Sequence, residues 1–338
     1  MKKLVFLSFL AVLAVYGFAQ DAAATTETAP AAPVEQATAP AADAASADQQ
    51  SATPSATASQ DSFVYESDHY TVRSYVSADH AQAVAERLEA YQVEFNRYFH
   101  FDIAKQGLKL KVRIFATKAR FDQYLQRVIN ESRSDYVYLH YSDAARSELV
   151  GFVDAKTPAP EASIAHQGFI QFLRAFVAIP PLWLRVGFEV YFEDIAWDAD
   201  AKQATLKENL AWLDTYKDLA FGSRTEEAID LDTLLSLNVD KAKEKIQVFY
   251  PQAWALINYL ANSSNKAHNR ILWDAITQLN PTATLDDNSS AVVEKAFKWE
   301  DADMFAEGFS AYFKDKKTYR ELVQAGIDFY ANEKAKDA

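Results

Sequence analysis

Three side chains that could carry chemistry lie in one stretch, residues 163–193, which reads SIAHQGFIQFLRAFVAIPPLWLRVGFEVYFE. They are His166, Glu189 and Glu193, and imidazole and carboxylate groups both bind zinc and transfer protons. Taken singly, each has a plainer interpretation: a lone histidine among apolar residues is typical of a hydrogen-bonded structural side chain, and glutamates one turn apart are typical of a solvated helix face. Ser163 lies close to His166, but no Gly-x-Ser-x-Gly elbow supports a serine nucleophile.

The residues around these side chains form a framework. It consists of Ala165, Pro180, Pro181, Trp183, Leu184, Gly187, Tyr191 and Phe192. The stretch resembles the gluzincin metallopeptidases, in particular the secreted peptidase-MA-like group of bacterial proteins, which carries His-Glu-x-x-His, then Pro-Pro-x-Trp-Leu, then Glu-Gly-x-Ala-x-Tyr-Phe. The resemblance implies that the two histidines and the later glutamate bind zinc, and that the glutamate beside the first histidine is the general base. It extends more loosely over residues 69–262.

Carried over residue by residue, the motif lacks its chemistry. His166 matches the first ligand, but Gln167 stands at the general base, Ile170 at the second histidine and Val186 at the third ligand. Glutamine is nearly isosteric with glutamate but cannot accept a proton, and isoleucine and valine have no lone pairs. One imidazole is too small a ligand set to hold zinc. We therefore expect these four positions to be vestigial, with no catalytic residue, no bound metal and no cofactor.

Three classes of function follow. The first is a non-catalytic domain that binds a peptide or protein or serves as a scaffold, with a groove at a sheet edge over residues 148–153, because strand addition needs no zinc. The residues expected at this groove are Leu149, Gly151, His166, Trp183, Tyr191 and Trp254. The second is a zinc metallopeptidase with relocated ligands, in which His166 acts with Glu189 or Glu193. The third is a surface antigen or adhesin without a groove.

The composition excludes several other classes. The chain has 338 residues and no cysteine, which rules out disulfides, cysteine nucleophiles and thiolate-bound zinc. It has 8 glycines, and neither GxGxxG nor GxxxxGK(S/T) occurs, so the common phosphate-binding loops are absent. A net charge of −13 disfavours binding to a phosphate backbone, so we expect no nucleic-acid partner.

The N-terminal residues predict export. A basic MKK start, an apolar run over 4–18 and a small residue at Ala19 predict a signal peptide over 1–19 and a mature start near Gln20. Residues 20–60 consist almost entirely of Ala, Thr, Pro, Ser, Gln and acidic residues, which cannot bury enough apolar surface to order the chain, so we expect a disordered tether. We expect a non-lipidated protein of the bacterial periplasm or outer envelope that is not an integral membrane protein after cleavage.

The remaining pattern predicts an α+β fold. Alternating runs predict strands at 63–65, 70–75, 108–115, 136–141 and 148–153. Apolar spacings of three and four predict helices at 77–98, 117–129, 161–177, 182–195, 205–219, 251–263, 266–279, 289–298, 301–314 and 317–333. We thus expect a small mixed sheet with helices followed by an all-α C-terminal half. The domain boundaries are predicted at 61–262 for the gluzincin-like domain and 263–338 for a helical extension packed on it.

Overall fold

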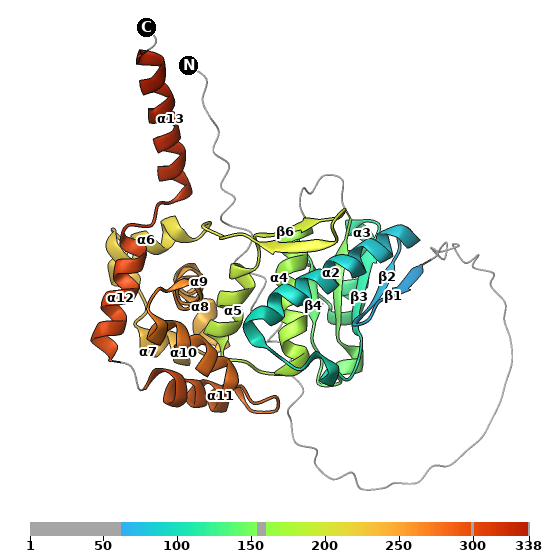
Figure 1. Cartoon of the computed structure of the whole chain (residues 1–338). Helices are drawn as coiled ribbons and strands as arrows, with labels where there is room; N and C mark the ends of the chain where they lie inside the picture. The colour runs from blue at the N-terminus through green and yellow to red at the C-terminus, as the bar shows by residue number, and fades with distance from the viewer. Residues whose placement is uncertain (1–61, 154–159, 299–300, 337–338) are drawn as a thin grey trace, which may run out of the picture.

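The computed structural model describes residues 62–153, 160–298 and 301–336 (Figure 1). A five-stranded sheet with its helices forms the N-terminal half, and helices make up the C-terminal half. The predicted α+β fold class is therefore confirmed. The predicted signal peptide (1–19) and tether (20–60) lie outside the described residues. No helix in the described part of the chain is both long enough and apolar enough to cross a membrane.

The sheet is mixed and has the strand order β1-β2-β3-β5-β4. Its strands are β1 (Phe63–Glu66), β2 (Tyr70–Ser74), β3 (Leu110–Phe115), β4 (Val137–Leu139) and β5 (Glu148–Phe152). β2, β3 and β5 are parallel, and each outer strand is antiparallel to its neighbour. The predicted free edge at 148–153 is wrong, because Val150 on β5 pairs with Arg113 on β3 and with Val137 on β4. β4 forms the edge instead.

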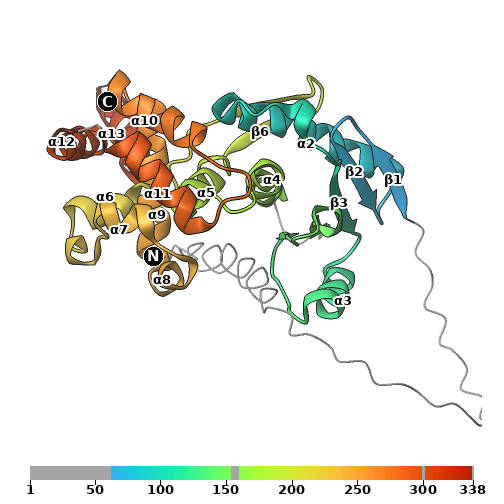
Figure 2. The same cartoon turned by 90° about the horizontal axis from the view of Figure 1, so that it is seen from below.

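Helices cover both faces of this sheet (Figure 2). They are α2 (Ala78–Phe99), α3 (Lys118–Ile129) and α4 (Pro160–Phe176). α2 and α4 lie on one face and α3 on the other, where the guanidinium of Arg113 is 4.9 Å from the ring of Tyr124. Ser77 and Thr117 accept hydrogen bonds from backbone N–H groups in the first turns of α2 and α3, so the helix starts predicted there are confirmed.

A hairpin that the sequence did not predict joins the two halves. It consists of β6 (Ile195–Asp198) and β7 (Gln203–Leu206), which are antiparallel. The predicted helices at 182–195 and 205–219 are therefore wrong at their boundaries: α5 ends at Tyr191, and α6 begins at Leu213. Each strand of the hairpin has four residues, a length at which hydrophobic periodicity does not separate strand from helix.

Most of the C-terminal helices gather around α9 (Ile246–Asn262). The others are α6 (Leu213–Phe221), α7 (Leu231–Ser236), α8 (Val239–Glu244), α10 (Lys266–Thr277), α11 (Leu285–Val292), α12 (Ala302–Lys314) and α13 (Tyr319–Lys336). α9 begins before Pro251, which lies inside the helix and removes one backbone donor there. A π-helical turn, Val293–Phe297, continues α11. α13 projects away from the other helices (Figure 1).

α5 (Leu182–Tyr191) lies at the centre of the molecule, between α4 and α9. Every residue of α5 is buried. Gly187 permits its close approach to α9, because a Cβ atom at this position would lie 2.5 Å from the carbonyl oxygen of Ala253. α5 therefore positions side chains that face both halves of the protein.

Candidate functional site

α4 and α5 bring His166, Glu189 and Glu193 together inside the protein. Nδ1 of His166 lies 2.7 Å from Oε1 of Glu193, and Nε2 lies 3.5 Å from Oε2 of Glu189. The side chains of His166, Glu189 and Glu193 are 6%, 0% and 11% exposed. The interpretation of the two glutamates as a solvated helix face is wrong, because α4 and α9 cover the helix that carries Glu189.

Arg185 completes this group from one turn earlier on α5. Its Nη1 donates a hydrogen bond to Oε1 of Glu189 at 2.6 Å, and its side chain is 1% exposed. We call Arg185, His166, Glu189 and Glu193 the inner cluster. A buried charge is unfavourable unless it is paired, and here the cations and carboxylates are present in equal number when His166 is protonated.

The inner cluster favours a protonated His166. Burial by itself lowers the pKa of His166, but the hydrogen bond to Glu193 and the negative charges of Glu189, Glu193 and Asp135 outweigh it and raise the pKa above its ordinary value. The charges around His166 therefore favour an ion pair with Glu193.

Ser163 is not activated by His166. Its hydroxyl donates a hydrogen bond to Oδ2 of Asp135 at 2.5 Å, whereas the ring nitrogens of His166 lie next to the carboxylates of Glu189 and Glu193. A serine nucleophile needs a base within hydrogen-bond reach of its hydroxyl. Ser163 and His166 therefore do not form a nucleophile–base pair.

Gln167, at the position where the resemblance would place the general base, connects α4 to the sheet edge by a hydrogen bond. Its Oε1 accepts a hydrogen bond from the backbone N–H of Tyr138 at 2.9 Å, and Gln167 is 3% exposed. Tyr138 is the middle residue of β4. A peptide added to this edge would compete for that N–H group. Gln167 therefore occupies the centre of the edge at which an extended ligand would pair.

The two other positions expected to be vestigial belong to the hydrophobic core. Ile170 on α4 and Val186 on α5 are both 0% exposed. Their side chains contribute packing at positions where the resemblance would place metal ligands.

Most of the residues expected at a peptide groove are buried. Leu149, Trp183 and Trp254 are 0% exposed, and His166 belongs to the inner cluster. Gly151 lies inside the sheet, where a Cβ atom would be 2.5 Å from the ring of Tyr136. The glycine therefore makes room for an aromatic side chain of the protein itself.

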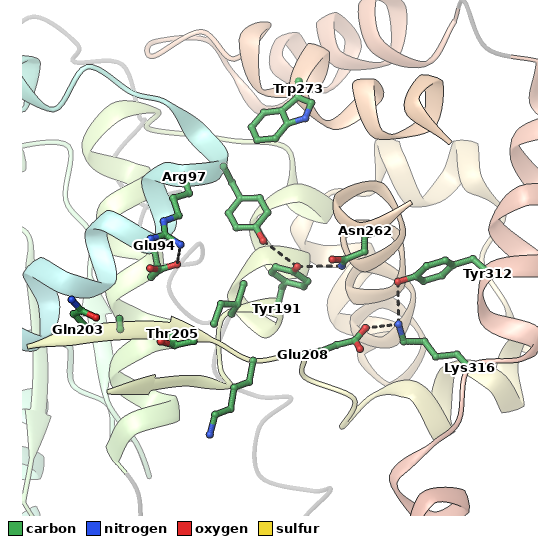
Figure 3. A pocket seen from close by; sticks show the side chains of 14 residues that line it. Glu94, Arg97, Tyr191, Gln203, Thr205, Glu208, Asn262, Trp273, Tyr312 and Lys316 are labelled. Atoms are coloured by element: carbon green, nitrogen blue, oxygen red, sulfur yellow. Dashed lines mark hydrogen bonds and ion pairs between the residues drawn. The ribbon is translucent and has the colours of Figure 1, made fainter. Parts of the chain in front are cut away.

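Tyr191, the sixth expected residue, lines a cavity of about 690 Å³ between the two halves (Figure 3). We call this the outer cavity; its walls come from α2, β7, the ends of α5 and α9, α10, α12 and the residues just after α12. The hydroxyl oxygens of Tyr191 and Tyr98 are 3.2 Å apart, and Nδ2 of Asn262 donates to the Tyr191 hydroxyl at 3.2 Å. On the far side, Lys316 contacts Glu208 and donates to the hydroxyl of Tyr312 at 3.0 Å.

The sequence did not predict two features of these sites. The pairing of Arg185 with Glu189 had a signal, since the two residues are four apart on a helix. The outer cavity had none, because its lining residues range from Glu94 to Lys316 and only the fold brings them together.

The residues around His166 do not fit the zinc site that the resemblance implies. Glu189 is already bound to the guanidinium of Arg185, and Gln167, Ile170 and Val186 supply no anionic or imidazole donor. Within the described residues, no group of three or more His, Asp or Glu side chains could hold a metal ion. Comparison of the chain with protein-family models and with curated proteins gives no match.

Proposed function

We propose that this protein is an exported bacterial envelope protein whose folded part is a non-catalytic scaffold or protein-binding domain that resembles the gluzincin peptidases. The inner cluster is the observation that carries the proposal. In this cluster, the guanidinium of Arg185 pairs with the buried carboxylate of Glu189, and the carboxylate of Glu193 pairs with the imidazole of His166. Each charged group has an ion-pair partner from the chain itself, which supports a structural role for the cluster.

The scaffold role is favoured over capture of an extended peptide. Ile170 and Val186 fill two of the former ligand positions with apolar side chains. Gln167 accepts the N–H of Tyr138 at the centre of β4, so strand addition would have to displace a buried hydrogen bond. A protein partner would then bind elsewhere on the surface of the fold.

A zinc peptidase with relocated ligands is the second candidate, because His166, Glu189 and Glu193 are adjacent. Elemental analysis of the purified protein, after incubation with excess zinc and dialysis, separates the two. The first proposal expects well under one zinc per chain and no cleavage of casein. Near-stoichiometric zinc that disappears in His166→Ala would overturn it and support the relocated-ligand enzyme.

The resemblance itself is tested by restoring the motif. The triple variant Gln167→Glu, Ile170→His, Val186→Glu is expected to acquire zinc affinity, whereas Gln167→Glu alone acquires none. Buried groups without their metal cost several kcal/mol, so the triple variant is refolded with zinc present. A folded triple variant without zinc affinity would show that the alignment with the gluzincin motif is wrong.

Export is tested separately. The mature protein is expected in the periplasmic or outer-envelope fraction, with its N-terminus near Gln20. Mass spectrometry that finds Met1 on the mature protein would contradict signal cleavage.

A further inference from the structure

The outer cavity has an aromatic wall. The rings of Trp273 and Tyr98 are 13° from parallel, with centroids 6.4 Å apart, and both residues are half-buried. In Figure 3, Trp273 lies at the rim, beyond the hydrogen-bonded group of Tyr191 and Asn262. An aromatic face of this kind provides dispersion and C–H contacts to the flat apolar face of a ring-shaped ligand.

Hydrogen-bonding groups are held in place beside this wall. Nδ2 of Asn262 donates to the Tyr191 hydroxyl and, at 2.9 Å, to the carbonyl oxygen of Asn258, which fixes the orientation of the amide. Within the described residues, Oδ1 of Asn262 and the side chains of Gln203 and Thr205 on β7 make no hydrogen bond. All three residues are exposed. The cavity thus offers free acceptors and donors next to a preformed polar group.

The charges that line the cavity are largely paired with each other. Arg97 is 3.2 Å from the carboxylate of Glu94, and Lys316 contacts the carboxylate of Glu208. Lys207 is the remaining charged residue of the lining. Such a lining suits a ligand that is polar but carries little charge, because the lining offers no cluster of charges of one sign.

We propose that the outer cavity binds a saccharide, whose ring presents an apolar face to Trp273 and hydroxyl groups to Asn262 and β7. The volume of about 690 Å³ falls within the range of roughly 300–1,000 Å³ that small-molecule sites occupy. The inference does not depend on the proposed function, because neither the inner cluster nor the sheet edge takes part in it.

The test is calorimetric titration of the full mature protein with maltotriose, cellotriose and the trisaccharide of N-acetylglucosamine, with trialanine as the competing class. At least one saccharide is expected to bind with a Kd below about 1 mM. Trp273→Ala is expected to weaken that binding roughly tenfold and Asn262→Ala roughly fivefold, from the loss of a ring face and of a hydrogen-bonding group. Trp273→Phe keeps an aromatic face and is expected to lie between Trp273→Ala and the wild type.

Phe221→Ala is the matched control, because Phe221 is a 42% exposed aromatic residue of the helical half that does not line the cavity. It is expected to bind as the wild type does. Circular dichroism establishes that each variant is folded. The proposal is overturned if no saccharide of the panel shows binding at a ligand concentration of about 10 mM, ten times the expected upper limit of Kd. It is also overturned if trialanine alone binds, or if Trp273→Ala and Asn262→Ala both bind the saccharide as tightly as Phe221→Ala does.

Discussion

The inner cluster and the outer cavity both include residues of α5, but they differ in how far their polar groups are exposed to solvent. In the inner cluster, Arg185 and Glu189 are 1% and 0% exposed and meet each other. In the outer cavity, the hydroxyl of Tyr191 accepts a hydrogen bond from the exposed Asn262. The first group is completed by the protein, whereas the second retains free hydrogen-bonding capacity at its surface.

This difference separates a role in stability from a role in ligand binding. Charges buried in a core must be neutralised by their neighbours, and once they are paired they contribute to specifying the fold. Polar groups at the rim of a cavity exchange partners with water at little cost. Stability should therefore depend on the inner cluster, and ligand binding on the outer cavity.

The largest effect is expected from breaking the buried ion pair. Arg185→Ala leaves Glu189 buried without its cation and should lower the free energy of unfolding by about 3–5 kcal/mol. Lys316→Ala removes a cation of the outer cavity whose partner, Glu208, has a 43% exposed side chain, and should cost less than about 1 kcal/mol. Urea unfolding of both variants measures the contrast.

A double variant separates charge from packing in the same experiment. Arg185→Met combined with Glu189→Leu replaces both charges with apolar side chains of similar length and should recover most of the stability that Arg185→Ala loses. Equal losses in Arg185→Ala and Lys316→Ala would contradict the distinction between the two sites.

The next effect concerns the hydrogen bond that closes the sheet edge. Gln167→Ala leaves the N–H of Tyr138 without its acceptor and should cost about 1–3 kcal/mol. Asn262→Ala, at the outer cavity, should cost less than about 1 kcal/mol, because water can replace an exposed amide. Thermal unfolding detects both, since about 1 kcal/mol corresponds to roughly 2–4 °C for a domain of this size.

Gln167→Glu serves as the control for that comparison. A protonated carboxyl group has a carbonyl oxygen that also accepts from Tyr138, so at acidic pH, where no charge is buried, this variant should lose less stability than Gln167→Ala. If both variants unfold at the wild-type temperature, Gln167 does not hold the edge strand.

A smaller effect is expected in the pH dependence of stability. Because the folded protein raises the pKa of His166, the stabilisation from its protonated form is fully present below the unfolded value of about 6.5 and is lost as the pH rises through the folded value. The difference in unfolding free energy between wild type and His166→Gln should therefore decrease from pH 6 to alkaline pH. A difference that grows with pH would contradict the ion pairs with Glu189 and Glu193.

The sequence predicts the regular parts of this fold well. Helices α2 and α3 have strong amphipathic patterns and the side-chain caps Ser77 and Thr117, so local chemistry determines where they begin. The hairpin at β6 and β7 is short, and its pairing depends on contacts between segments that local patterns do not encode.

The candidate site divides in the same way. That Gln167, Ile170 and Val186 cannot act as a general base or as metal ligands follows from their residue types alone. That Glu189 is buried, and that β5 is an interior strand, depends on which elements cover α5 and on the strand order. Neither follows from the spacing of residues along the chain.

No effect at all is expected from deleting residues 20–60. Their composition contains no aromatic residue and a single larger aliphatic one, Val34, so they cannot contribute a packed face to either site. The variant that lacks them, compared with the full mature chain, should unfold at the same temperature and keep the contrast between Arg185→Ala and Lys316→Ala. A decrease of more than about 4 °C, which corresponds to more than about 1 kcal/mol, would mean that part of this segment docks on the fold and that the two sites are not complete without it.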